Sequence, residues 1–163
     1  MNAVWKDVLW RQFGAGIDML ENALLACPEE LWRDRSRQTE FWYVVYHTLF
    51  WLDLYLSGSA EGFAPPAPFT LDEMDPAGLM PERVYEKDEL RAYLAYCRRK
   101  CRETIESLTE ARAAEPCAFG RLELGFAELL LYNMRHVQHH AGQLNLILRQ
   151  QVGSAPGWVA QAT

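Results

Sequence analysis

The chain has 163 residues, of which 50% are hydrophobic and 23% are charged. This length and composition are typical of one globular domain whose core needs no disulfide, and they exclude a disordered chain. The formal net charge of −6 argues against a nucleic-acid partner, because proteins that bind a phosphate backbone usually present a basic patch. We therefore expect a single domain over residues 1–163.

The N-terminal segment carries Lys6 and Asp7 where a secretion signal would have its apolar core, so no signal peptide is expected. The richest apolar run, residues 41–56, includes His47 and Asp53 and is shorter than the roughly 20 residues that cross a bilayer. The four cysteines include no CxxC pair, which is typical of reduced thiols. These features predict a cytoplasmic protein with no membrane contact.

Apolar residues recur at spacings of three and four over residues 4–25 and predict a first long helix, which Pro28 ends. A second helix is predicted over residues 40–57, with Thr39 as its N-cap and Gly58 as its C-cap. Seven of its residues are aromatic, and it is apolar almost all round. Such a helix is buried on most of its sides.

The segment 58–86 holds five of the eight prolines and is long for a connection within a compact domain. A connection of this length can return along the second helix, so the two helices that it joins are expected to run parallel. A third helix is predicted over residues 87–108 and a fourth over residues 126–151, with Gly153 as a stop. No stretch of strand length alternates strictly. The predicted fold is all-α, a four-helix bundle with a long crossover between helices two and three.

The second helix also suggests association. A helix in a four-helix bundle turns one stripe of about 100° towards the core, so part of this helix needs another cover. The residues in question are Trp42, Tyr46, Leu49 and Leu56. The segment 58–86, with Phe63 and Phe69, can cover them, and so can a second copy of the chain. We predict that a second copy does so, in a homodimer.

Histidines give the strongest functional signal. The sequence has four of them, His47, His136, His139 and His140. His136 and His140 are four residues apart, which places them on one face of a helix, where two imidazoles can bind one divalent ion. His47, in the middle of the second helix, is the natural third ligand, whereas His139 points away from His140. Three histidines leave a coordination position open, which is typical of a catalytic site.

The segments HTLFWLDLYL (47–56) and HVQHHAGQL (136–144), together with PEELW (28–32), resemble the DinB/YfiT-like superfamily of metal-dependent four-helix-bundle proteins. The resemblance implies a DinB-like bundle in which His47, His136 and His140 hold a divalent transition metal. Zinc or nickel is expected first, with manganese or iron as alternatives. The resemblance also implies a metalloenzyme, since the superfamily includes transferases of low-molecular-weight thiols such as bacillithiol and relatives that use mycothiol in isomerisation.

The residues themselves leave the reaction open, and no catalytic residue can be named. A metal-dependent hydrolase needs a general base near the metal, and the sequence identifies no carboxylate for this role. A small thiol needs no such base, because the metal can hold the thiolate. We therefore favour a thiol S-transferase-like activity on a low-molecular-weight thiol or another small molecule. The alternatives are a hydrolase and a non-catalytic bundle braced by its metal, with a role in stress response or partner binding.

Residues next to the histidines are expected to border the site. Gln143 lies one turn after His140 and can orient a ligand, or it can be an ordinary surface residue. Asn133 and Tyr132 lie about one turn before His136 and can reach the same pocket.

Other features are interpreted as structural. Gly142, inside a helix, predicts the close approach of another helix. Cys97 and Cys101 are expected to pack as small apolar side chains. The basic residues 98–100 are expected to cover a solvated face, and Asp53 is expected to form a hydrogen bond between helices.

Overall fold

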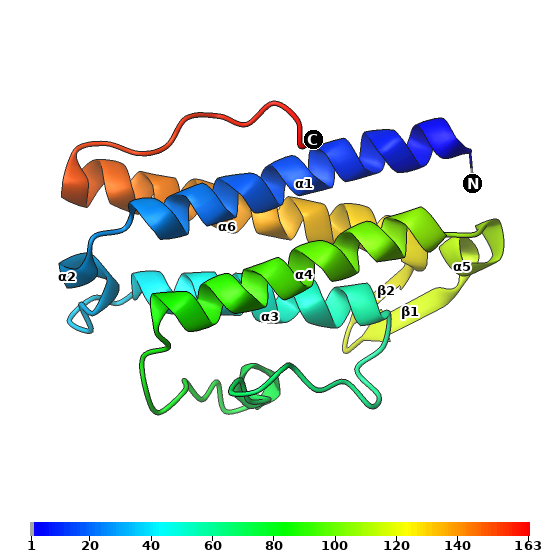
Figure 1. Cartoon of the computed structure of the whole chain (residues 1–163). Coiled ribbons are helices and arrows are strands. Elements are labelled where there is room, and N and C mark those ends of the chain that lie inside the picture. The colour runs from blue at the N-terminus through cyan, green and yellow to red at the C-terminus, as the bar shows by residue number, and fades with distance from the viewer. Residues whose placement is uncertain (1) are drawn as a thin grey trace.

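The computed structural model describes residues 2–163, which are mostly helical (Figure 1). The four long helices are α1 (Ala3–Ala26), α3 (Phe41–Ser57), α4 (Lys87–Ser107) and α6 (Phe126–Val152). The shorter ones are α2 (Glu29–Trp32), α5 (Glu110–Ala114) and the 3-10 turn η1 (Asp72–Met74). This helical content agrees with the predicted all-α class.

A small β-hairpin corrects the expectation that the chain has no strands. β1 (Pro116–Phe119) pairs antiparallel with β2 (Leu122–Gly125), and Gly120 in the turn between them has a φ of +62°. Each strand has only four residues, which is too short for an alternating pattern to be recognised in the sequence. The hairpin packs against α6 and lies at the end of the molecule where that helix begins (Figure 1).

The long helices are arranged so that α1 and α3 each contact both α4 and α6 (Figure 1). α3 and α4 begin at the same end of the molecule, as expected for two helices joined by a long returning segment. α1 and α6 begin at the opposite end. α3 and α6, which carry the histidines of interest, therefore run antiparallel side by side.

Local signals explain where α3 and α4 begin and end. Gly58 ends α3 with a φ of +76°, a conformation that side chains other than glycine rarely adopt. The N-cap of α3 is Glu40 and not the predicted Thr39, and the Glu40 carboxylate accepts a hydrogen bond from Trp42 Nε1 at 2.6 Å. A reciprocal capping box between Glu86 and Glu89 starts α4.

The segment 58–86 covers α3 within a single chain. Trp42, Tyr46 and Leu49 are all fully buried. The Phe69 ring stacks on Tyr46 with a centroid separation of 5.8 Å, and the Phe63 ring meets Phe50 edge-on at 5.5 Å. The segment 58–86 therefore supplies the cover of this face of α3, which was the alternative to cover by a second copy of the chain.

Because this face of α3 is covered within one chain, it no longer requires a second copy. The homodimer stays a prediction. Sedimentation equilibrium at micromolar concentration checks it, because a homodimer would have about twice the chain mass of 18.8 kDa. A single species at the mass of one chain would contradict the dimer.

The C-terminal segment returns along α1 (Figure 1). The Ala162 backbone N–H donates to the Arg11 carbonyl at 2.8 Å, and Gln12 Nε2 donates to the Ala160 carbonyl at 3.2 Å. Gly14 permits this approach, since a Cβ built there would lie 2.6 Å from the Ala162 Cβ. The prediction that another helix approaches closely at Gly142 is wrong, because a Cβ built there would meet nothing within 4 Å.

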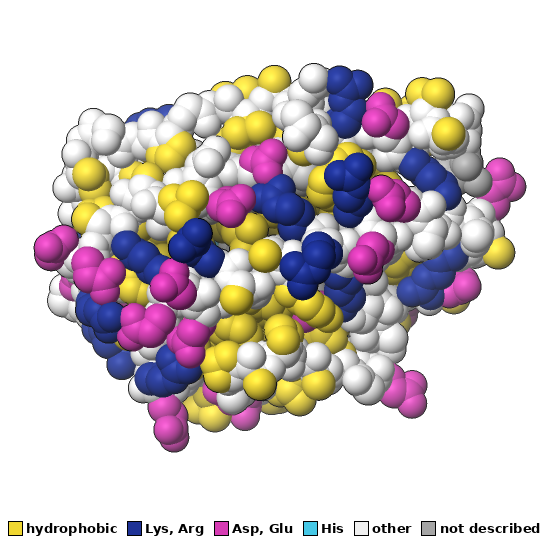
Figure 2. All heavy atoms as spheres, viewed as in Figure 1, with side chains coloured by type: hydrophobic (Ala, Val, Ile, Leu, Met, Phe, Trp, Pro, Cys, Tyr) yellow, Lys and Arg dark blue, Asp and Glu magenta, His cyan; other side chains and the backbone are white. Residues whose placement is uncertain are grey.

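Charged side chains of both signs lie over α4 (Figure 2). The expectation that residues 98–100 cover a solvated face holds for the exposed Arg99 but is wrong for Arg98 and Lys100, which are partly buried and paired with Asp18 and Glu21 and with Asp53, respectively. Cys97 and Cys101 are buried, and burial raises the pKa of both thiols, so they pack as apolar groups. No helix in residues 2–163 combines the length and apolar character needed to cross a bilayer.

Candidate metal centre

Three of the four histidines meet where α3 and α6 lie against each other. His136 Nε2 is 3.4 Å from His47 Nε2 and 3.1 Å from His140 Nε2. Each ring offers a nitrogen within 4.8 Å of the others. Among residues 2–163, these form the one group of three or more histidine, cysteine or acidic side chains that could hold a metal ion. The helical spacing thus brings His136 and His140 together, and α3 adds His47.

Hydrogen bonds to side chains outside the cluster fix the tautomers of His47 and His140. His47 Nδ1 lies 2.7 Å from Glu73 Oε2, and His140 Nδ1 lies 2.7 Å from Gln143 Oε1. A carboxylate and an amide oxygen only accept hydrogen bonds, so Nδ1 must be the donor in both pairs. Each neutral ring then turns the bare lone pair of Nε2 towards the cluster. Gln143 therefore contacts a histidine of the cluster, as expected.

Glu73 is the site residue that sequence reasoning missed. It belongs to η1 within the crossover segment, and its side chain is 3% exposed. Its Oε2 accepts hydrogen bonds from His47 Nδ1 and, at 3.0 Å, from Trp51 Nε1. Burial raises the pKa of Glu73, but its interactions with His47 and its hydrogen bonds with Tyr43 and Trp51 together outweigh burial, so the pKa lies below its usual value. The carboxylate is thus held in its ionised form.

Two other residues predicted to border the site, Asn133 and Tyr132, have no recorded hydrogen bond to the clustered histidines. Asn133 is buried, and its Nδ2 donates to the Leu52 carbonyl at 3.0 Å, so its recorded hydrogen bond joins α6 to the α3 backbone and not to a histidine. Tyr132 meets the Tyr55 ring edge-on at 5.4 Å. His139 is exposed and lies outside the cluster of three.

His47 lies closer to the surface than its apolar surroundings in the sequence suggested. Its side chain is 29% exposed, and its neighbours one turn away on α3, Tyr43 and Trp51, are half-buried. The His47 side chain therefore does not lie at the centre of the core. It faces α6 and η1 at the edge of the core.

Two rings of the cluster resist protonation. Burial, assisted by the neighbouring histidines, lowers the pKa of His136 from 6.5 to about 3. Burial also lowers the pKa of His140, to about 4, although its hydrogen bond to Gln143 opposes the shift. Both rings are therefore neutral near pH 7, which is the form that binds a metal.

This gives a prediction for the metal-free protein. A histidine whose pKa is lower in the folded than in the unfolded chain takes up protons on unfolding, so acid favours the unfolded state. Between pH 7 and pH 5, His136 and His140 should each lower the free energy of unfolding by about 2 kcal/mol. Urea denaturation with a chelator present measures this loss. A His136→Leu variant should lose less stability over the same interval, and an equal loss would contradict the assignment.

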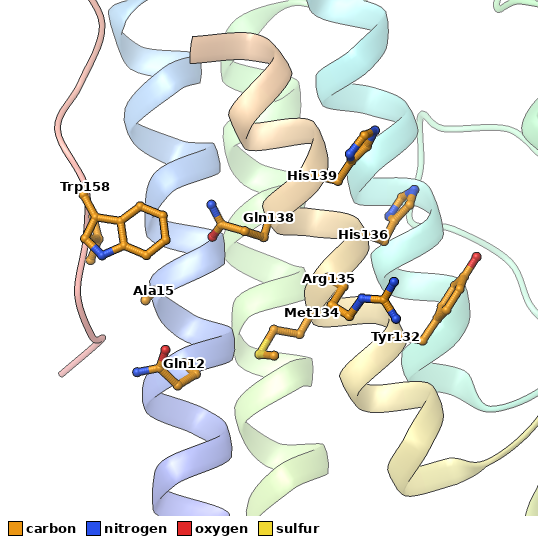
Figure 3. A pocket seen from close by; sticks show the side chains of 10 residues that line it. Gln12, Ala15, Tyr132, Met134, Arg135, His136, Gln138, His139 and Trp158 are labelled. Atoms are coloured by element: carbon orange, nitrogen blue, oxygen red, sulfur yellow. The ribbon is translucent and has the colours of Figure 1, made fainter. Parts of the chain in front are cut away.

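His136 also lines a cavity of about 580 Å³ between α1, α6 and the C-terminal segment (Figure 3). Trp158 and Gln12 border one side of it, while Arg135 and Tyr132 lie with His136 on the other side of α6. Arg135 is the one lining residue with a permanent charge, and no acidic side chain lines the cavity. The region next to the histidines is therefore suited to a neutral or anionic small molecule.

Comparison with known proteins assigns the chain to a family. Neither the curated proteins nor the solved structures gave a match to this chain. The model of the DinB superfamily matches residues 12–144, a span that contains all three clustered histidines together with Glu73 and Gln143. This span is most of the chain, and the protein therefore belongs to the DinB superfamily.

Proposed function

We propose that this DinB-superfamily protein binds one divalent transition metal through His47, His136 and His140 and uses it to activate a small thiol. Zinc or nickel is the proposed ion. In this proposal the four long helices form the DinB-like four-helix bundle, and the segment 58–86 is its crossover. The observation that carries the proposal is the convergence of three Nε2 atoms, two of which have their lone pairs directed at the cluster by Glu73 and Gln143.

The distances between the nitrogens suit a bound ion. Zinc–histidine bonds of 2.0–2.1 Å in tetrahedral geometry separate two ligand nitrogens by about 3.3 Å. The separations from His136 Nε2 are 3.1 and 3.4 Å. His136 has only one proton to offer and cannot satisfy the lone pairs of both His47 and His140 in linear hydrogen bonds. A cation accepts the Nε2 lone pairs of all three rings at once, whereas leaving polar groups unpaired in an apolar environment is costly.

A divalent ion held there would supply Lewis acidity and lower the pKa of a thiol or water that reaches it. Three protein ligands leave room for such a group. The chain adds the cavity beside His136, where the Arg135 guanidinium attracts a negatively charged substrate. These features support a low-molecular-weight thiol that carries an acidic group.

Hydrolysis is less well supported than thiol transfer. A hydrolase needs a base within hydrogen-bond reach of the attacking water. Glu73 is the carboxylate bonded to the cluster, but its oxygen is on Nδ1 of His47, on the opposite side of the ring from the converging Nε2 atoms. It is therefore badly placed to take a proton from a nucleophile at the cluster.

The first test is metal content. Untagged protein, stripped and reloaded with zinc or nickel, is expected to retain about one equivalent of metal. A tag of histidines must be absent because it would itself hold nickel. Less than about 0.2 equivalents of either metal, or of manganese or iron, would contradict the proposed site.

The second test is activity. The loaded protein should accelerate the reaction of bacillithiol or cysteine with a fluorogenic alkyl halide, in which the thiolate displaces halide and a C–S bond forms. The His140→Ala variant should lose this acceleration together with its metal, while His139→Ala should keep its metal. A protein that holds its metal but accelerates no thiol reaction would support the alternative of a non-catalytic, metal-braced bundle.

A further inference from the structure

The turn η1 is attached to α3 through a buried carboxylate. Leu71, which precedes the turn, is 47% exposed, Met74, its last residue, is 39% exposed, and η1 contains no fully buried residue. By contrast, the Glu73 side chain is 3% exposed. Burying a carboxylate is costly unless hydrogen bonds compensate for the lost water. The contacts that Glu73 makes therefore help to hold this turn against α3, together with the hydrogen bond that the Tyr46 hydroxyl donates to the Thr70 carbonyl at 3.1 Å.

These contacts hold the His47 ring in one orientation. Glu73 Oε2 accepts from His47 Nδ1 at 2.7 Å and from Trp51 Nε1 at 3.0 Å. The two donors are one turn apart on the same face of α3, so the carboxylate is fixed between them. With Nδ1 bonded to Glu73, His47 directs Nε2 towards His136 Nε2.

We infer that Glu73 is a positioning residue that presets His47 to bind the metal and couples metal binding to the docking of η1 on α3. The inference rests on the proposed metal site. A carboxylate that accepts a proton from a ligating histidine fixes its tautomer and raises its basicity. Coupling between two sites is reciprocal, so an ion bound by His47 strengthens the hold of the same ring on Glu73.

The test compares three variants of the full chain. Glu73→Ala removes the acceptor and the charge, whereas Glu73→Gln keeps an acceptor and removes the charge. Asp72→Asn is the matched control, because it removes one negative charge from the same turn, and Asp72 Oδ2 accepts its hydrogen bond from the Thr70 hydroxyl and not from a histidine. Circular dichroism establishes that each variant is folded.

The first readout is affinity for Zn²⁺, measured by competition with a chromophoric chelator. Glu73→Ala should bind Zn²⁺ about 10- to 100-fold more weakly than the wild type. Glu73→Gln should fall between the two, and Asp72→Asn should stay within about 2-fold of the wild type. Wild-type affinity in Glu73→Ala, or an equal loss in Asp72→Asn, would overturn the inference.

The second readout is hydrogen exchange in the turn. The Met74 and Asp75 backbone N–H groups donate to the Leu71 and Asp72 carbonyls at 2.9 and 3.0 Å, so their exchange reports on the integrity of the turn. Zn²⁺ should slow their exchange in the wild type and in Asp72→Asn but not in Glu73→Ala. Equal slowing in Glu73→Ala would overturn the coupling.

The third readout needs no metal. Nitrogen NMR of the metal-free wild type should show His47 protonated on Nδ1, and Glu73→Ala should lose this preference. If the wild type takes up no Zn²⁺, the proposed function and the coupling both fail, while the tautomer still decides whether Glu73 positions His47. An unchanged tautomer in Glu73→Ala would overturn that part as well.

Discussion

Replacing His136 or His140 with alanine is expected to abolish metal binding. Both supply an Nε2 atom to the cluster, and among residues 2–163 no further histidine, cysteine or acidic side chain belongs to this group. The loss in affinity should exceed the roughly 100-fold that removal of an outer partner can cause. His47→Ala should also weaken binding strongly, because it removes the one ligand from α3.

His139→Ala is the control for this prediction. His139 is adjacent to His140 on the same helix, but it is exposed and lies outside the cluster. Metal analysis of untagged, reloaded protein should therefore show normal content in this variant. The ion should also stabilise the wild type and His139→Ala against unfolding, by about 2.7 kcal/mol at a free concentration 100 times the dissociation constant. Equal loss of metal from His139→Ala and His140→Ala would contradict the assignment.

Local patterns were enough to predict the α6 half of this site. His136 and His140 are four residues apart, and a helix places such residues on one face whatever surrounds it. The ends of the helices followed from equally local signals, such as Gly58 at the end of α3 and Gly153 at the end of α6. These features depend on backbone geometry within one or two turns, which the sequence records directly.

Glu73 could not be predicted in the same way. It lies 26 residues from His47, in a segment without helical or strand periodicity, and its contact depends on how that segment folds back over α3. The same return explains why the segment 58–86, one of the two covers considered, lies over this face of α3. Phe69 from the interior of the segment 58–86 and Tyr85 from its end pack on Tyr46, with centroid separations of 5.8 and 4.8 Å. Long-range packing of this kind leaves no local mark in the sequence.

The second large effect is expected away from the histidines, at the ion pair between α3 and α4. The Asp53 side chain is fully buried, and its Oδ1 lies 2.5 Å from Lys100 Nζ. Lys100 also donates to Ser57 Oγ at 2.7 Å, and the Tyr93 hydroxyl donates to Asp53 Oδ2 at 3.0 Å. The predicted role of Asp53 as a hydrogen-bond partner between helices is thereby confirmed.

Lys100→Met should lower the free energy of unfolding by about 3–5 kcal/mol, because it leaves the buried Asp53 carboxylate without a countercharge. Arg99→Met is the matched control, since Arg99 is an exposed cation on the same helix and its loss should change stability by no more than about 0.5 kcal/mol. Urea denaturation at pH 7 measures both.

A double variant distinguishes two causes of the stability loss in Lys100→Met, an unpaired buried charge and lost side-chain packing. Asp53→Asn removes the charge and keeps an oxygen that can accept from Tyr93, so Lys100→Met combined with Asp53→Asn should be more stable than Lys100→Met alone. If the double variant is no more stable, the loss comes from packing of the lysine stem and not from an unpaired charge. Metal affinity should be unchanged in all of these variants, because neither Asp53 nor Lys100 has a recorded contact with the histidine cluster. A parallel loss of metal would instead show that the α3–α4 contact helps to hold His47 in place.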